Sequence, residues 1–162
     1  MYPMSTEDPA PTRHYRADSQ CFAEDSIGYL LKQVYVSMNR MIDRDMAPLD
    51  LTAMQWRPLI LIARGKADTA AELARLAGID TGAMTRTLDR LQAKGLLHRV
   101  RSQQDRRVVK LELTQAGHEA ASRIPAVIAQ VLNRHLRGFD ATEAAQLRHF
   151  LLRMLANGSE PG

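Results

Sequence analysis

The chain has little of what marks several common protein classes. It holds one cysteine, Cys21, so it forms no internal disulfide, and its cysteine and five histidines show no metal-ligand spacing. No apolar run approaches the ~18 residues of a membrane span, and the N-terminus lacks the basic and apolar regions of a secretory signal. Nucleophile elbows, P-loops, dinucleotide fingerprints and paired catalytic carboxylates are missing as well. The sequence therefore predicts a cytoplasmic protein that is not an enzyme, with no metal, cofactor or membrane partner.

Aromatic residues make up only 5% of the 162 residues, against 45% hydrophobic and 25% charged residues. This composition is ordinary for a soluble globular chain. A core with so few rings is mostly aliphatic and alanine-rich, which suits helices. The length fits one compact domain, or one domain with an added dimerisation arm.

The positive charge is concentrated in one fifth of the chain. The whole chain carries +4, whereas residues 80–110 alone hold eight basic and three acidic side chains, a charge of +5. The basic residues are Arg86, Arg90, Lys94, Arg99, Arg101, Arg106, Arg107 and Lys110. Such a stripe is typical of a phosphate-binding face. A solvated basic surface is the alternative that charge alone leaves open.

The N-terminal part of the chain is predicted to be an arm followed by a long helix. Residues 1–16 contain three prolines and are mostly polar, which indicates a mobile arm. Residues 17–24 fit a short helix. Residues 26–46 place apolar side chains at steps of three and four, on one face of a long helix, and Pro48 ends it.

A second helix is expected to start at Thr52. Thr52 and Gln55 match a capping box, and Leu51 and Trp56 sit at the two hydrophobic-staple positions around it. Pro58 follows inside the expected helix. We therefore predict that Pro58 removes one helical hydrogen bond and kinks the axis.

Two short helices joined by a tight turn come next. Residues 69–77 open with a capping box and form a short helix that Gly78 ends. Asp80 or Thr81 caps the following helix, which runs to about Lys94. A short helix, a glycine turn and a second helix are typical of a helix-turn-helix.

The remaining chain predicts a β-hairpin and two more helices. Residues 96–101 and 108–113 are strand-like, with a polar hairpin tip between them. Thr114 caps a long helix to about Gly138, and Asp140 caps the last one. Both helices carry apolar stripes that a small central module cannot cover.

The predicted fold is mainly α with a small β-wing. It comprises a winged helix-turn-helix DNA-binding region over residues 49–113 and a helical dimerisation region built from both chain ends, residues 17–48 and 114–157. A natural solution packs the two ends together and against a second copy, which buries their apolar stripes.

The second helix of the helix-turn-helix carries the candidate base contacts. The major groove admits one helix, whose first turns face base edges. Thr81 and Thr85 share a face, Ala83 is small enough for close approach, and Arg86 and Arg90 are spaced for guanine or phosphate contacts. A solvated helix face with an intrahelical pair to Asp89 is the alternative.

The hairpin tip carries two further candidates, Arg106 and Arg107. A narrow minor groove attracts inserted arginine. Asp105 is expected to hold the Arg107 guanidinium by a charge-assisted hydrogen bond. An ordinary charged loop is the alternative.

Three stretches, residues 73–97, 105–108 and 113–117, resemble in order the recognition helix, wing and following helix entry of the MarR family. The resemblance implies an obligate homodimer joined through its terminal helices. It also implies binding to a pseudo-palindromic operator, usually as a repressor. The family's wing arginine falls on Arg107 and its orienting acid on Asp105. Pro58 and the long N-terminal arm depart from the family pattern.

Many members of that family release DNA when a small aromatic or phenolic acid enters a cavity near the dimer helices. The resemblance therefore implies a repressor that such an acid, or its thioester, releases. Candidate ligand residues are Ser26, Tyr29, Trp56 and Arg57, an aromatic wall with one cation. Two alternatives stay open: a redox-sensing repressor that uses Cys21, and a winged-helix interaction module that never touches DNA.

Overall fold

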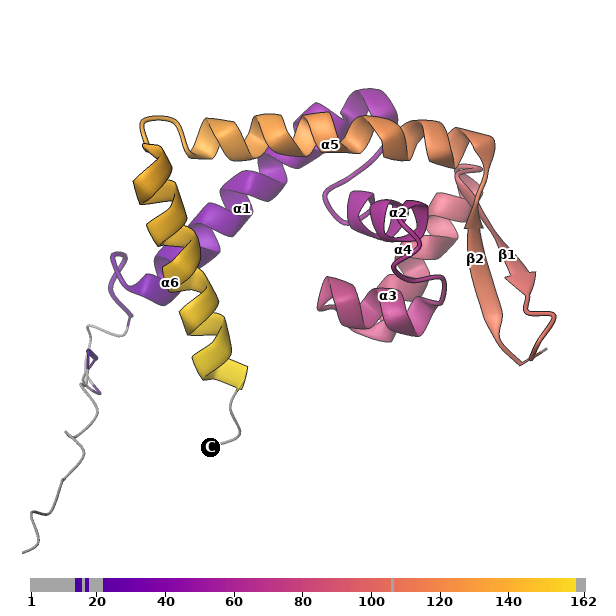
Figure 1. Cartoon of the computed structure of the whole chain (residues 1–162), viewed down its shortest axis with the longest axis horizontal. Coiled ribbons are helices and arrows are strands. Elements are labelled where there is room, and N and C mark those ends of the chain that lie inside the picture. Colours follow the sequence, from indigo (N-terminus) through magenta and orange to yellow (C-terminus); the bar gives the residue numbers. More distant parts are fainter. Residues whose placement is uncertain (1–13, 16, 18–21, 106, 160–162) are drawn as a thin grey trace, which may run out of the picture. The chain divides into compact units, whose positions relative to one another are not determined.

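The computed structural model describes residues 14, 15, 17, 22–105 and 107–159. These residues form helices and one two-stranded hairpin (Figure 1). The chain divides into two units, one up to Ser37 and the other from Met38, and the division falls within α1 (Ile27–Met46). The predicted arm, apart from two of its residues, and Cys21 lie outside the described residues. In the described part, no helix is long and apolar enough to cross a membrane.

The first unit contains the N-terminal half of α1, which begins at Ile27 as the apolar spacing predicted. The Ser26 Oγ accepts a hydrogen bond from Tyr29 N at 3.4 Å, and the Tyr15 hydroxyl accepts one from Ile27 N at 2.9 Å. Both satisfy amides that a helix start leaves unpaired. Of the residues 17–24 that were predicted to form a short helix, 18–21 lie outside the described residues; Phe22 is in a 3-10 conformation, and residues 23–26 form a turn in which Ser26 N donates to the Ala23 carbonyl.

The second helix, α2 (Trp56–Ala63), starts four residues later than expected. After the short helix η2 (Ala47–Leu49), Gln55 N bonds the main-chain oxygen of Thr52, and only the Gln55 side chain makes a capping contact, to Thr52 N at 3.2 Å. Pro58 is thus third in the helix and buried. The prediction that it removes a helical hydrogen bond is wrong, because first-turn amides have no partner inside the helix.

The helix-turn-helix forms as predicted from α3 (Ala70–Ala77) and α4 (Thr81–Ala93). Thr69 caps α3 by accepting from Glu72 N at 3.3 Å, and Asp80 caps α4 by accepting from Ala83 N at 2.9 Å. Gly78 adopts a φ of 68° between them, a left-handed conformation that glycine enters without strain. Local sequence therefore sets both ends of the turn.

The predicted wing is an antiparallel pair, β1 (Leu97–Arg101) and β2 (Val109–Leu113). Leu97 faces Leu113 at its base and Arg101 faces Val109 near its tip. Leu97, Leu111 and Leu113 turn inward and are buried. The outer edge of β2 is also occupied, since Leu111 N donates to the Asp68 carbonyl at 2.7 Å.

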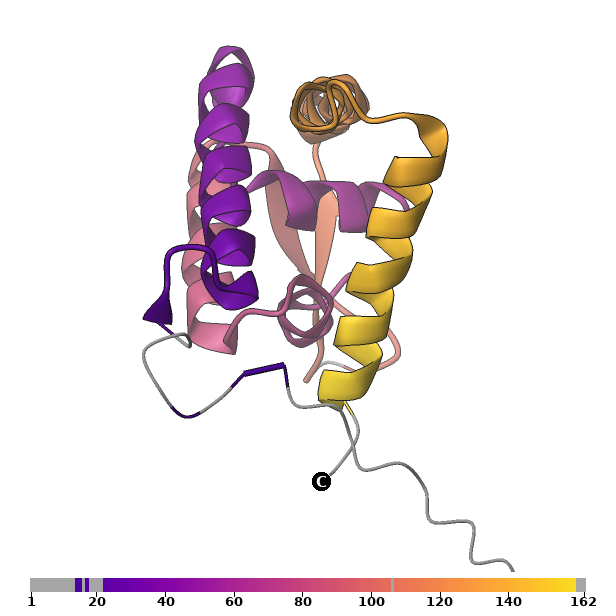
Figure 2. The same ribbon diagram turned by 90° about the vertical axis from the view of Figure 1, so that its left-hand side faces the viewer.

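The chain then enters α5 (Gln115–His135) and α6 (Ala141–Ser159). Thr114 caps α5 by accepting from Gly117 N at 3.1 Å, and its hydroxyl donates to the Gly95 carbonyl at 2.6 Å. A Cβ on Gly117 would overlap the main-chain oxygen of Leu96, so only glycine permits this close approach. Figure 2 views α5 end-on and shows the chain turning sharply into α6.

One apolar core holds the second unit together. It is built around fully buried side chains of α2, the helix-turn-helix, the wing base and α5: Leu59, Leu73, Met84, Leu88, Leu91, Leu97, Ile124 and Val131. By contrast, no residue of α6 is buried. The core therefore fixes the helix-turn-helix against the wing and leaves the C-terminal helix uncovered.

Candidate nucleic-acid interface

The recognition helix α4 has one buried face and one exposed face. Met84, Thr87, Leu88 and Leu91 are buried, which orients the helix. The opposite face presents side chains from its first turns to solvent: Thr81, Thr85, Arg86 and Arg90. Ala83 lies at the edge between the two faces, partly buried. The structure thus brings all five predicted residues of this helix onto or beside one accessible surface.

The two arginines on that surface are unpaired. Within the described residues, Arg86 and Arg90 make no side-chain hydrogen bond or ion pair. The expected alternative, an intrahelical pair to Asp89, is wrong because Asp89 Oδ1 instead bonds Arg99 Nη2 of β1 at 2.7 Å. The Thr85 hydroxyl donates to the Thr81 carbonyl at 2.8 Å, which fixes its rotamer.

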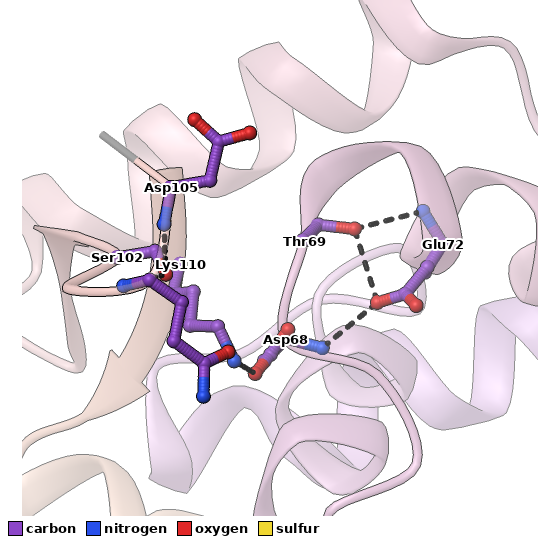
Figure 3. Close-up of polar contacts among 7 residues, drawn as sticks. Asp68, Thr69, Glu72, Ser102, Asp105 and Lys110 are labelled. Atoms are coloured by element: carbon purple, nitrogen blue, oxygen red, sulfur yellow. Dashed lines mark hydrogen bonds and ion pairs between the residues drawn. The ribbon is translucent and has the colours of Figure 1, made fainter. Parts of the chain in front are cut away.

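The wing tip is shaped by short-range hydrogen bonds (Figure 3). The buried Ser102 hydroxyl accepts from Gln104 N at 3.2 Å and Asp105 N at 3.4 Å. Asp105 Oδ1 accepts from the main-chain N of Arg107 at 2.9 Å. The expected bond to the Arg107 guanidinium is therefore wrong: the carboxylate fixes the backbone two residues on, as aspartate does in turns. Arg106 lies outside the described residues.

Each strand of the wing is tied to the helix-turn-helix by an ion pair. On β1, Arg99 contacts Asp89 and also Gln92 Oε1 of α4, at 2.5 Å. On β2, Lys110 Nζ lies 2.8 Å from Asp68 Oδ2, in the loop before α3. This carboxylate raises the pKa of Lys110 above its usual 10.5. Lys110 is therefore charged at neutral pH, and its contribution to the pair is lost as pH rises through that raised pKa.

These contacts divide the basic stripe into engaged and free charges. Lys94 contacts the Asp50 carboxylate at 3.2 Å, the Asp50 carbonyl and Gln55 Oε1 at 3.1 Å, and with Arg99 and Lys110 it is neutralised within the protein. The basic side chains without such a partner, as far as the structure describes the stripe, are Arg86, Arg90, Arg101 and Arg107. Four of the seven basic residues of the stripe that the structure describes are thus free for phosphates.

The candidate ligand residues fall in both units. Ser26 and Tyr29 line a pocket of about 440 Å³ in the first unit together with Tyr15, Phe22 and Gly28. In the second unit, Trp56 packs partly against the core, and Arg57 Nη2 donates to the Leu76 carbonyl at the end of α3, at 3.3 Å. Among the described residues, no group of three or more His, Cys, Asp or Glu side chains is arranged to hold a metal.

Sequence reasoning missed Asp68 and the structural role of Arg99. Asp68 stands 42 residues before Lys110, and no local pattern joins them. In the sequence, Arg99 is only one of several basic residues of the stripe. The capping box at Thr69 predicts the helix start beside Asp68, but it does not indicate that Asp68 contacts the wing.

A capped recognition helix with a free basic face, beside an antiparallel hairpin, defines the class as a winged helix-turn-helix protein. The model of the MarR family matches residues 49–108. The multiple antibiotic resistance protein MarR of Escherichia coli (strain K12) is 32% identical over 130 residues, covering 80% of this chain and 90% of that protein. The chain belongs to the MarR family, whose members are transcription regulators and not enzymes.

Solved structures agree with this assignment. A variant of E. coli MarR complexed with operator DNA has a TM-score of 0.70 at 32% identity, and the match covers 80% of this chain and 93% of that one. The MepR–DNA complex of S. aureus has a TM-score of 0.76 over 82% of this chain and 98% of that one. At 19% identity the second likeness shows the fold alone. The chain is a DNA-binding transcription regulator with a winged-helix fold.

Proposed function

We propose that two copies of the chain bind one pseudo-palindromic operator and repress the adjacent promoter. Each copy lays the first turns of α4 in a major groove and brings its wing to the neighbouring minor groove. The observation that carries this proposal is the free face of α4, where Arg86 and Arg90 are exposed without partners in the described chain. An arginine with no internal partner can bond guanine or phosphate without first breaking an ion pair.

Base reading by α4 combines hydroxyl and methyl contacts. The Thr85 hydroxyl proton is engaged by the Thr81 carbonyl, so this side chain offers a base edge its methyl group and an acceptor oxygen. A threonine methyl packs well on a thymine methyl. Ala83 leaves room for close approach beside it. This surface supports preference for a thymine-containing half-site flanked by guanine contacts from the arginines.

The wing supplies the minor-groove contact. Arg107 is exposed, and its main-chain N is held by the Asp105 carboxylate at the tip of the wing. Arginine entering a narrow A·T-rich groove gains from the enhanced negative potential there. We assign this role to Arg107 and, from the sequence, to Arg106.

Dimerisation follows from uncovered apolar side chains at both ends of the chain. α6 exposes Phe150, Leu152 and Leu155, and the first unit exposes Ile27 and Tyr35. Exposed apolar side chains on a helix are often covered by a partner. In this proposal a second copy covers these side chains by an isologous contact that also sets the spacing of the two α4 helices.

The pocket in the first unit supports release by a small aromatic acid or its thioester. Three rings line it, from Tyr15, Phe22 and Tyr29, and its volume of about 440 Å³ suits a small ligand. Of the predicted ligand residues we retain Ser26 and Tyr29 for this pocket. The redox alternative gains no support, since Cys21 lies outside the described residues.

Two binding measurements test the proposal. A gel shift with the protein's own promoter region separates a DNA-binding repressor from an interaction module that ignores DNA. Thermal shift against a panel of phenolic acids and their thioesters tests the effector, with Tyr29→Ala as the pocket variant. Stabilisation of the wild type that Tyr29→Ala does not reduce would place the effector elsewhere.

A further inference from the structure

Lys110 belongs to the basic stripe, and charge pattern alone assigns it to the DNA backbone. Its ammonium instead lies 2.8 Å from Asp68 Oδ2, with the two side chains 42% and 45% exposed (Figure 3). An ion pair this exposed contributes little to folding stability. Its effect must therefore be sought in what the two residues connect rather than in the energy of the contact.

Asp68 holds the wing at a second point. Its carbonyl accepts a hydrogen bond from Leu111 N at 2.7 Å. The main chain and the side chain of Asp68 therefore bind two adjacent residues of β2, Leu111 and Lys110. Its own N donates to Glu72 Oε2 at 3.3 Å, and the same Glu72 oxygen accepts from the Thr69 hydroxyl at 3.0 Å. Thr69 is the cap of α3. One residue thus joins the outer strand of the wing to the start of the first helix of the helix-turn-helix.

This connection limits how the wing can move. Lys110 is three residues from Arg107, and β2 is paired with β1 along its whole length, from Val109 to Leu113. The Arg99 contacts hold β1 to α4 on the other side. The two ion pairs, together with the main-chain bond from Leu111 to Asp68, therefore resist a pivoting of the hairpin about its base.

We propose that Asp68 is a positioning residue for DNA binding: through Lys110 it orients the wing so that Arg107 reaches the minor groove while α4 occupies the major groove. The inference rests on the proposed function. The alternative assigns Lys110 to a DNA phosphate, and the two assignments predict opposite changes in DNA affinity when Asp68 loses its charge. If Asp68 positions the wing, removing its charge loosens the wing and weakens DNA binding. If Lys110 binds a phosphate, the same change frees the Lys110 ammonium and strengthens DNA binding.

The test compares Asp68→Asn with Glu112→Gln in the full-length protein. Glu112 also lies on β2 and faces His98 across the hairpin at 3.4 Å, but this contact stays within the wing. Both variants remove one negative charge, so a general electrostatic effect changes the DNA affinity of both by a similar amount. The probe is a labelled duplex selected by the wild type from a random-sequence pool, and affinity is read by fluorescence anisotropy.

Asp68→Asn is expected to bind this duplex about two- to fivefold more weakly. This fold-change corresponds to the free energy that an exposed ion pair typically contributes. Glu112→Gln is expected to bind as the wild type does or slightly more tightly. Lys110→Met breaks the same pair from the other side and should reproduce the loss, with no further loss in the double variant. Tighter or unchanged binding by Asp68→Asn overturns the proposal.

The Arg107→Ala background distinguishes positioning from a general structural effect. If Asp68 acts through the wing, Asp68→Asn costs little further affinity once Arg107 is absent, because the group that it positions is gone. A full additional loss in that background overturns the proposal. Failure of the wild type to select any duplex at low salt would instead refute the proposed function, before Asp68 is tested.

Discussion

Replacing Arg101 by glutamine is expected to make operator binding less sensitive to salt, whereas the same change at Lys94 is not. Arg101 ends β1, is exposed and has no side-chain partner in the described chain. Lys94 is held by Asp50 and Gln55. The slope of log K against log[salt] changes by about 0.9 per phosphate neutralised. Two copies carry two Arg101 side chains, so Arg101→Gln should reduce the slope by about 1.8, and Lys94→Gln by about zero.

Anisotropy titrations at a series of KCl concentrations measure both slopes. The two variants are matched, because each removes one positive charge from the same stripe and each leaves a polar side chain of similar size. Thermal unfolding of both variants checks that Lys94→Gln still folds, since it loses internal contacts. Equal changes in the two slopes, or a larger change at Lys94, would refute the division into free and engaged charges.

Two further substitutions test the wing and the junction beneath it. Arg107→Ala should weaken operator binding by about 1–3 kcal/mol and reduce preference for A·T-rich flanks, measured on duplexes that differ only in those flanks. An unchanged affinity would mean that the wing arginine makes no contact. Gly117→Ala should destabilise the fold by about 1–3 kcal/mol or more, because the added methyl meets the Leu96 main chain, whereas Gly65→Ala has open space but a strained φ of 62°. Denaturant unfolding compares the two, and a smaller loss at Gly117 than at Gly65 would contradict the close approach.

Local chemistry explains why much of the fold could be predicted from the sequence. The caps at Thr69, Asp80 and Thr114 each bond an amide three residues on, so the residues that define them are neighbours in the chain. The alternation of apolar and polar residues along β2 likewise predicts which of its side chains are buried. Five predicted residues of the recognition helix follow directly, because cap and period together fix which face is exposed.

Long-range contacts account for what could not be predicted. The partners of Lys94, Arg99 and Lys110 come from other elements of the fold, so charge counting overestimated the free stripe. The sequence predicts a contact between Asp105 and the Arg107 guanidinium because it shows the two charges. It does not show the turn in which the Asp105 carboxylate accepts from the main-chain N of Arg107.

The start of α2 was misplaced for a related reason. The capping pattern at Thr52 forms only in part, since residues 52–55 make a separate turn, closed by hydrogen bonds to the Thr52 carbonyl, before the helix begins at Trp56. This shift moves Pro58 into the first helical turn, where it is tolerated. Separately, the four candidate ligand residues divide between two units because aromatic content alone carries no information on which rings meet.

Hydroxyl-radical footprinting of the selected duplex, combined with the mass of the complex in solution, tests the central claim most directly. The account predicts two chains per duplex, with two recognition-helix sites centred about one helical turn apart, or a multiple of it, and protected minor-groove positions beside them. The minor-groove protection should vanish with Arg107→Ala while the central sites remain. One chain per duplex, or a footprint that Arg107→Ala leaves intact, would contradict it.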